Sequence, residues 1–422
     1  MQDILYLTHR IPYPPNKGDK IRSWHILKYL AQRYRVHLGT FVDDHDDWQH
    51  VDTVKKLCGE THFASLNPRT ARLRSLGALT GKRPLTLDYY HNRGLQQWVD
   101  TVMKEQSIER VLVFSSAMAQ YVMNARQARR IIDFVDIDSD KWRQYAEKKP
   151  WPMSWLYRRE SRSLLSYERK VAYEFDASLF VSQAEADLFQ QLAPESATKT
   201  SFFNNGVDAG YFSPAHEYPN PYHSDEAAIV FTGAMDYWPN IDAVQWFARE
   251  ILPEVLASNP DVRFYIVGSR PTPQVQALTA LAGVHVTGAV ADIRPYLAHA
   301  RLAVAPLRIA RGIQNKVLEA MAMAKPVVAS IQALEGIAAK IGEEVLLARD
   351  HKEFVATIST LLQHPQNNIG QAARARALAD YTWERNLERV DDLLSPEPGM
   401  TFHSTATASK PIALTTAGVM HE

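Results

Sequence analysis

The chain has 422 residues, of which 46% are hydrophobic and 22% are charged, a composition typical of globular proteins. This length predicts two domains, and no apolar window reaches the ~18 residues of a membrane span. Lys plus Arg and Asp plus Glu number 47 each, so no overall positive charge attracts nucleic acid. Cys58 is the only cysteine, which excludes an intrachain disulfide and a thiolate metal cluster. The N-terminus is unlike a signal peptide, and we expect a cytoplasmic protein.

The first half of the chain alternates apolar, strand-like runs with helical or loop segments. Strands are predicted at DILYLT (residues 3–8), RVHLGTFV, ERVLVFSS, ARRIIDFVDID and DASLFVS, and the first helix at SWHILKYLAQRY. This alternation is typical of βαβ units in a parallel sheet. We therefore expect a first α/β domain over residues 1–205.

A polar stretch follows, and the pattern restarts with AAIVFTGAM, VRFYIVGS, VHVTGA, RLAVAPL and KPVVAS. A second doubly wound α/β domain is predicted over residues 215–370. Residues 371–394 are expected to form a C-terminal helix that packs back toward the first domain, and residues 395–422 a disordered tail. Because open parallel sheets bind ligands beyond the carboxyl ends of their strands, the site should lie between the domains.

The candidate binding segment lies in RLAVAPLRIARGIQNKVLEAMAMAKPVVAS, which reads as strand, glycine-bearing loop, helix and strand. Amide groups near Gly312, Ile313 and Gln314 can hold a diphosphate at the start of the helix. Lys316 would add a full positive charge there. Glu319, three residues further, lies on nearly the same face and can accept hydrogen bonds from ribose hydroxyls. An alternative is that Lys316 and Glu319 form only a surface ion pair, worth about 0.3–0.5 kcal/mol.

The first half offers a second candidate segment, HRIPYPPNKGDKIR. Gly18 lies between the first strand and the first helix, where the lack of a Cβ atom lets the backbone approach a ligand. Lys17, Lys20 and Arg22 are expected to surround it. His9 is a candidate acid–base group, although a lone histidine is more often structural.

The motifs, taken together, resemble the retaining GT-B glycosyltransferases of family four (glycosyl transferases group 1). LEAMAMAKPVVAS is similar to the family's E-A-M-A followed by G-x-P-V-V-A, and NNGVD, FTGAMDYWPNIDAV, FYIVGS and VTGAV occur in the family's order. PYPPNKGDKIR, VDIDSDKW and VSQAEADLF are closest to the exosortase- and PEP-CTERM-associated exopolysaccharide glycosyltransferases. The resemblance implies a GT-B fold, in which two Rossmann-like domains face a cleft.

The resemblance also assigns roles to individual residues. It implies that Glu319 binds the ribose of a nucleotide sugar and that the loop at 312–316 binds the diphosphate. The turn from Gly288 to Val290 would meet the edge of the base. The Gly18 loop would meet the donor phosphates and the acceptor from the other domain.

Two positions depart from the family pattern. Arg311 stands where the leading Glu of the E-x7-E motif usually contacts the transferred sugar. AMDYWPN also lacks the family's usual basic pair. Lys316, together with Arg311, is therefore expected to supply the positive charge for the phosphates.

Asp136 and Asp138 in VDIDSDKW are the candidate catalytic carboxylates of the first domain. They spell a D-x-D, which chelates a divalent ion in GT-A enzymes, but we set that interpretation aside because the resemblance is to GT-B. We expect them to orient the acceptor or polarise the reacting sugar. Alternatively, Asp138, Ser139 and Asp140 cap the following helix. No metal ion or other cofactor is expected.

Residues 142–172 are rich in Lys and Arg and include Trp142, Trp151, Trp155 and Tyr157. One or two amphipathic helices are predicted. Their basic aromatic face fits an anionic membrane surface at the inner face of the membrane, or equally a solvated helix face.

The sequence hypothesis is a retaining glycosyltransferase that uses a nucleoside-diphosphate sugar, with Lys316, Asp136 and Asp138 as catalytic groups. Its acceptor would be a saccharide or a lipid-linked saccharide in exopolysaccharide biosynthesis. The alternatives are a GT-B-type nucleotide-sugar 2-epimerase and a non-catalytic nucleotide-sugar-binding module.

Overall fold

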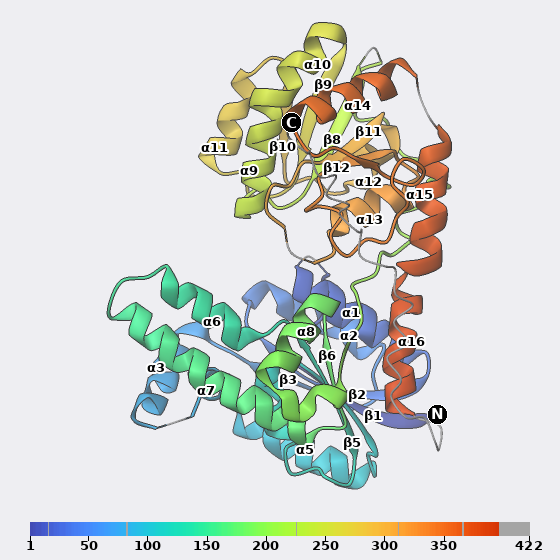
Figure 1. Ribbon diagram of the computed structural model, residues 1–422. Helices are drawn as coiled ribbons and strands as arrows, with labels where there is room; N and C mark the ends of the chain where they lie inside the picture. The colour runs from blue at the N-terminus through green and yellow to red at the C-terminus, as the bar shows by residue number, and fades with distance from the viewer. Residues whose placement is uncertain (16, 82, 225, 311, 365–366, 396–422) are drawn as a thin grey trace, which may run out of the picture.

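The protein is described by a computed structural model that contains two parallel β-sheets, one above the other in Figure 1. It covers residues 1–15, 17–81, 83–224, 226–310, 312–364 and 367–395. The expectations for Arg311 and for most of the tail at 395–422 fall outside these residues. The prediction of two doubly wound α/β domains is confirmed.

The first sheet has seven strands in the order β3-β2-β1-β4-β5-β6-β7, all parallel. Its strands are apolar on both faces, as expected for a parallel sheet covered by helices on two sides. In β1, Ile4 and Tyr6 belong to one core cluster, whereas Leu5 and Leu7 belong to another. The strands are β1 Gln2–Thr8, β2 Tyr34–Val42, β3 Thr61–Ser65, β4 Arg110–Phe114, β5 Arg129–Val135, β6 Ala177–Phe180 and β7 Thr200–Phe202.

Helices cover both faces of this sheet, and one pair projects from it. The helices α6 and α7 pack along each other as a hairpin that extends away from the sheet (Figure 1). The helices are α1 Gly18–Ala31, α2 Val51–Lys55, α3 Pro68–Ser75, α4 Leu85–Tyr89, α5 Arg93–Glu105, α6 Asp138–Glu147, α7 Met153–Glu174 and α8 Gln183–Leu192, with short turns η1 His45–His50, η2 Leu76–Thr80, η3 Ser116–Tyr121 and η4 Pro194–Lys199.

The second sheet has six parallel strands in the order β10-β9-β8-β11-β12-β13. They are β8 Ala227–Thr232, β9 Val262–Val267, β10 Val284–Gly288, β11 Leu302–Ala305, β12 Val327–Ala329 and β13 Leu346–Leu347. Its helical elements are α9 Trp238–Trp246, η5 Phe247–Ile251, α10 Leu252–Ser258, α11 Pro273–Gln276, η6 Ala277–Ala280, α12 Arg294–His299, α13 Asn315–Ala322, α14 His351–Gln363 and α15 Asn367–Asp380.

The strand orders locate a switch point in each sheet. Connections leave β1 and β4 toward opposite edges of the first sheet, and β8 and β11 do the same in the second. Doubly wound sheets bind ligands at such a point, outside the carboxyl ends of the strands. Figure 1 shows α13 on the side of the second domain that faces the first, and α1 on the side of the first that faces the second.

The chain passes between the domains twice, and the two passages touch. Val207 forms a β-bridge with Thr382, and its amide donates to the Tyr381 carbonyl at 2.7 Å. The segment predicted as one helix at 371–394 is two helices: α15 stays with the second domain and packs on α13, and α16, Trp383–Leu394, packs into the first-domain core. No helix in the described residues is long and apolar enough to cross a membrane.

Candidate functional site

The loop before α13 presents the start of that helix at the second switch point. Gly312 has φ +65°, a left-handed conformation that favours glycine, and nothing described lies within 4 Å of where its Cβ would be. Gln314 is the N-cap residue, and its Nε2 donates to the Gly312 carbonyl at 3.1 Å. The Gln314 side chain makes no capping hydrogen bond to the first turn of α13. The helix therefore directs its amino end, with the positive end of its dipole, into this site.

Lys316 is held at the same point by a residue in the first turn of α9, the helix that follows β8. Its Nζ donates to Asn240 Oδ1 at 3.1 Å, and Asn240 Nδ2 donates to the Ala234 carbonyl at 2.9 Å. A Cβ on Gly233 would lie 2.7 Å from Asn240 Nδ2, so a side chain at this position would press on the amide. The asparagine therefore fixes the lysine between the carboxyl ends of β8 and β11.

Burial perturbs both charged groups of α13. It lowers the pKa of Lys316 to about 8, against the attraction of Glu319. It also raises the pKa of Glu319 to about 7, against the attraction of Lys316. Both side chains keep part of their surface exposed. The alternative of a solvated surface pair is wrong, because the two groups are desolvated and form no ion pair within 4 Å among the described contacts.

A further polar group points to a ligand at this helix start. Asn315 Oδ1 is enclosed and lacks a hydrogen-bond partner in the described part of the chain. Neither Asn315 nor Asn240 was singled out by the sequence analysis, because an asparagine carries no distinctive signal on its own. Asn240 comes directly after AMDYWP, the segment in which the basic pair is missing, and this position could have marked it as a candidate site residue.

The other predicted donor-site residues lie at the same edge of the second sheet. Gly288 ends β10 with φ +70°, and the space beside it is open to at least 4 Å among described atoms. Val290 is partly buried against the second-domain core. Because carboxyl ends of parallel strands share one edge, the structure brings these residues to the same side as Gly312 and Lys316. Arg311 lies outside the described residues.

On the first domain, Gly18 is the first residue of α1, and nothing described lies within 4 Å of the place that a Cβ would take. Lys17 precedes it and is exposed. The expectation that Lys20 and Arg22 surround this glycine is wrong. Lys20 is 1% exposed and pairs with Asp47 at 2.6 Å, and Arg22 is 0% exposed and pairs with Asp133 at 2.7 Å. Buried charges require such partners, so both cations fasten α1 to the domain.

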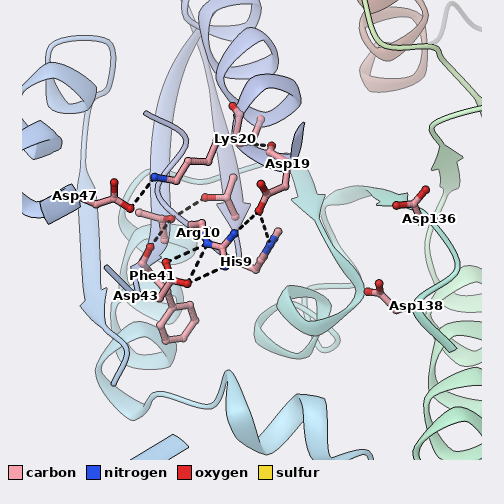
Figure 2. A network of polar contacts seen from close by, with 12 residues as sticks. His9, Arg10, Asp19, Lys20, Phe41, Asp43, Asp47, Asp136 and Asp138 are labelled. Atoms are coloured by element: carbon pink, nitrogen blue, oxygen red, sulfur yellow. Dashed lines mark hydrogen bonds and ion pairs between the residues drawn. The ribbon is translucent and has the colours of Figure 1, made fainter. Parts of the chain in front are cut away.

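A chain of charged groups lies beside Gly18, at the carboxyl end of β1 (Figure 2). Arg10 contacts Asp43 at 2.8 Å and Asp19 at 2.7 Å, and Asp19 Oδ2 lies 3.4 Å from His9 Nε2. Burial alone would raise the pKa of Asp19, but hydrogen bonding and attraction from His9 and Arg10 hold it far below its usual value. Asp19 is thus a fixed anion that orients the imidazole. His9 Nδ1 is enclosed and has no partner in the described residues.

Asp136 and Asp138 lie apart from that network, after β5 (Figure 2). Lys141 Nζ bridges them, at 2.8 Å from Asp136 Oδ2 and 3.3 Å from Asp138 Oδ1. Burial acts to lower the pKa of Lys141, but the attraction of the two carboxylates outweighs burial. The pKa of Lys141 therefore lies above its usual value. Val135, just before them, has φ +70°, which is strained for a β-branched residue. The described residues contain no group of three or more His, Cys, Asp or Glu that could hold a metal ion.

The first turn of α6 is capped from another helix. None of Asp138, Ser139 and Asp140 is the N-cap residue, which is Ile137. Instead, the amide and hydroxyl of Ser139 donate to the buried Glu168 of α7 at 3.2 and 2.5 Å. Burial and the nearby Asp138 raise the pKa of Glu168 to about 8. The capping interpretation is therefore wrong for Asp138, whose carboxylate remains at the site.

Comparison with known proteins identifies the class of this architecture. Residues 226–364 match the family model described as Glycosyl transferases group 1. No curated protein in the comparison matches the chain. Three similar solved structures share its fold. A glycosyltransferase from Rickettsia africae is 15% identical, with a TM-score of 0.63 over 94% of this chain and 99% of its own.

Sucrose-phosphate synthase from Thermosynechococcus elongatus is 18% identical, with a TM-score of 0.61 over 93% of this chain and 98% of its own. HepE from Anabaena, solved in complex with UDP, is 19% identical, with a TM-score of 0.61 over 93% and 99%. The GT-B fold expected from the sequence is thereby confirmed. Residues 226–364 thus match the glycosyl transferases group 1 model, and the chain as a whole has the two-domain fold of these solved structures.

Proposed function

We propose that the protein transfers a sugar from a nucleoside-diphosphate sugar to an acceptor hydroxyl, with retention of configuration. One observation carries the proposal: the glycine-bearing start of α13 converges with a desolvated Lys316 and Glu319 at the switch point of the second sheet. Such a place suits a diphosphate beside a ribose. The complex of the structurally similar HepE with UDP-glucose supports this class of donor.

In this mechanism the acceptor hydroxyl attacks the anomeric carbon on the face from which the diphosphate leaves, and the hydroxyl proton passes to the departing phosphate oxygen. The main barrier is negative charge that builds on the diphosphate as the glycosidic bond breaks. The α13 amides and Lys316 stabilise that charge without reorganising, because Asn240 already holds the lysine in place. Arg311 and the Gly18 loop contribute to the same phosphates in this proposal. Glu319 binds the ribose, and the Gly288–Val290 turn meets the base.

The first domain supplies the acceptor side. Asp136 and Asp138 accept hydrogen bonds from acceptor hydroxyls or from the reacting sugar, while Lys141 limits the repulsion between the two carboxylates. The acceptor we propose is a lipid-linked saccharide in exopolysaccharide biosynthesis, at the inner face of the cell membrane. The sequence resemblance supports this choice. The reaction requires no metal ion in this proposal.

A panel of nucleotide sugars tests the function. Each is incubated with the protein and a membrane lipid extract, and released nucleotide and glycosylated product are measured together. The proposal expects one donor to give both products in equal amounts, with the anomeric configuration kept in the product. D136N and D138N should reduce transfer while nucleotide binding stays unchanged. Conversion of the donor without transfer would instead indicate a 2-epimerase, and binding without turnover a non-catalytic module.

A further inference from the structure

Large apolar side chains are exposed at the end of the α6–α7 hairpin and on the neighbouring α3–η2 segment. Trp151 is 81% exposed, Trp155 54% and Leu73 71%, and Met153 and Leu76 are exposed as well. A soluble surface rarely gathers two tryptophans with other large apolar groups unless they meet a partner. Trp151 lies in the turn between the helices, where no packing requirement of the domain explains it.

The two segments form one surface although about 75 residues separate them in sequence. Arg159 of α7 donates from Nη2 to the carbonyls of Ala78, Gly81 and Arg83 at 2.5, 2.6 and 3.1 Å. These bonds fix the end of η2 against α7, one helical turn from Trp155. Figure 1 shows α3 beside α7 at the same projecting side of the first domain.

The same surface carries an excess of positive charge. Six exposed cations have no ion-pair partner among the described residues, namely Arg69, Arg72, Lys148, Lys149, Arg158 and Arg162. The nearby Glu147 is already engaged by Arg143 at 2.6 Å. We call these cations and the five apolar residues above the hairpin surface. On α7, Trp155, Arg158 and Arg162 recur at helical spacing and share one face.

We propose that the hairpin surface docks the protein on an anionic lipid bilayer. Tryptophan prefers the boundary between headgroups and acyl chains, and Lys and Arg beside it are attracted by anionic headgroups. A protein partner fits less well, because the cores of protein interfaces are depleted in lysine. A nucleic acid would leave the exposed Leu73, Leu76 and Met153 without a function.

The position of the surface relative to the site adds a role for the hairpin. The helix α6 starts at Asp138 and ends at Glu147 near the turn that carries Trp151. Ten helical residues span about 15 Å. A docked protein would thus hold Asp138 roughly one helix length from the headgroups, within reach of the saccharide end of a lipid-linked acceptor. This deepens the proposed function and rests on it only for the identity of the acceptor.

Vesicle flotation tests the docking. Wild-type protein is mixed with phosphatidylcholine vesicles, with and without phosphatidylglycerol, and the lipid-bound fraction is measured at low and high salt. The variants are K148Q/K149Q and W151S/W155S. The matched controls are K55Q/K56Q, an exposed lysine pair in and beside α2, and W48S, an exposed tryptophan elsewhere on the domain. Thermal unfolding shows that each variant is folded.

We expect binding only to anionic vesicles, weakened by salt, with an affinity about fivefold lower for each cation removed. W151S/W155S should weaken binding at every salt concentration, and the controls should bind as wild type. The proposal would be overturned if the wild type bound neutral and anionic vesicles equally or bound neither. It would also be overturned if the control variants lost as much binding as the hairpin variants, or if the surface captured a protein in place of vesicles. Nucleotide release with a soluble acceptor should be unchanged in the hairpin variants. Absence of turnover would refute the proposed function and leave the docking result intact.

Discussion

Replacing Lys316 with methionine removes the ammonium group and keeps an unbranched side chain of similar length. In the structure Nζ donates to Asn240 Oδ1 at 3.1 Å and has no carboxylate partner among the described contacts, so it can pair with an incoming phosphate. A hydrogen bond to a charged group contributes about 1.5–3 kcal/mol. We therefore expect K316M to lower kcat/KM for the donor about 10- to 150-fold. Because the charge matters most as the diphosphate leaves, kcat should fall more than KM rises.

The assay is the initial rate of nucleotide release at varied donor concentration. Lys325 provides the matched control, since burial also lowers its pKa to about 8. Its Nζ donates to the carbonyls of Ala298 and Ala300, just before β11 and away from the first turn of α13. K325M should lose stability and keep its rate per folded molecule. A wild-type rate in K316M, or an equal loss in K325M, would refute the reasoning.

Other consequences concern pH and packing. Donor affinity should fall by up to about tenfold per pH unit above pH 8, because the lysine must be protonated to pair with the phosphate; calorimetry should show this fall in wild type and not in K316M. The raised pKa of Glu168 means that the folded state favours its protonated form, so this group should lower the free energy of unfolding as pH rises from about 4.5 to about 8. E168Q should remove that dependence in chemical unfolding, an effect on the order of 1 kcal/mol or more. G206A should lower the melting temperature, because a Cβ there would lie 2.5 Å from the Trp383 backbone nitrogen, and overpacking costs about 1–3 kcal/mol; a melting temperature unchanged from wild type would contradict this contact.

The sequence predicts those parts of the molecule that depend on local pattern. Apolar runs located β1, β2, β4, β5 and β6 of the first sheet and β8 to β12 of the second, since strands buried on both faces must be apolar throughout. The loop and helix around Gly312 were recognisable for the same reason, because glycine, helix start and charge lie within eight residues of each other. The helix expected directly after this loop begins at Asn315. The strands β3, β7 and β13 were not predicted, because they are short and only partly buried.

Contacts between distant segments were not predictable in this way. In the sequence, Lys20 and Arg22 look like free cations beside Gly18. Only the fold shows that Lys20 pairs with Asp47, 27 residues away, and that Arg22 pairs with Asp133, 111 residues away. Glu168 likewise caps α6 from 29 residues further along the chain. A lone carboxylate in a helix gives no sign in the sequence of whether it faces solvent or a buried helix end.

The two touching passages between the domains have a mechanical consequence. The β-bridge between Val207 and Thr382 holds the two linkers side by side, and the hydrogen bond from the Val207 amide to the Tyr381 carbonyl resists pulling them apart. A rotation about this line needs torsion changes in only a few residues, whereas a sliding motion would break the pairing. The first domain and α16 should therefore rotate together as one rigid body about this axis. The separation between Lys316 and Asp138 would then be set by a single angle.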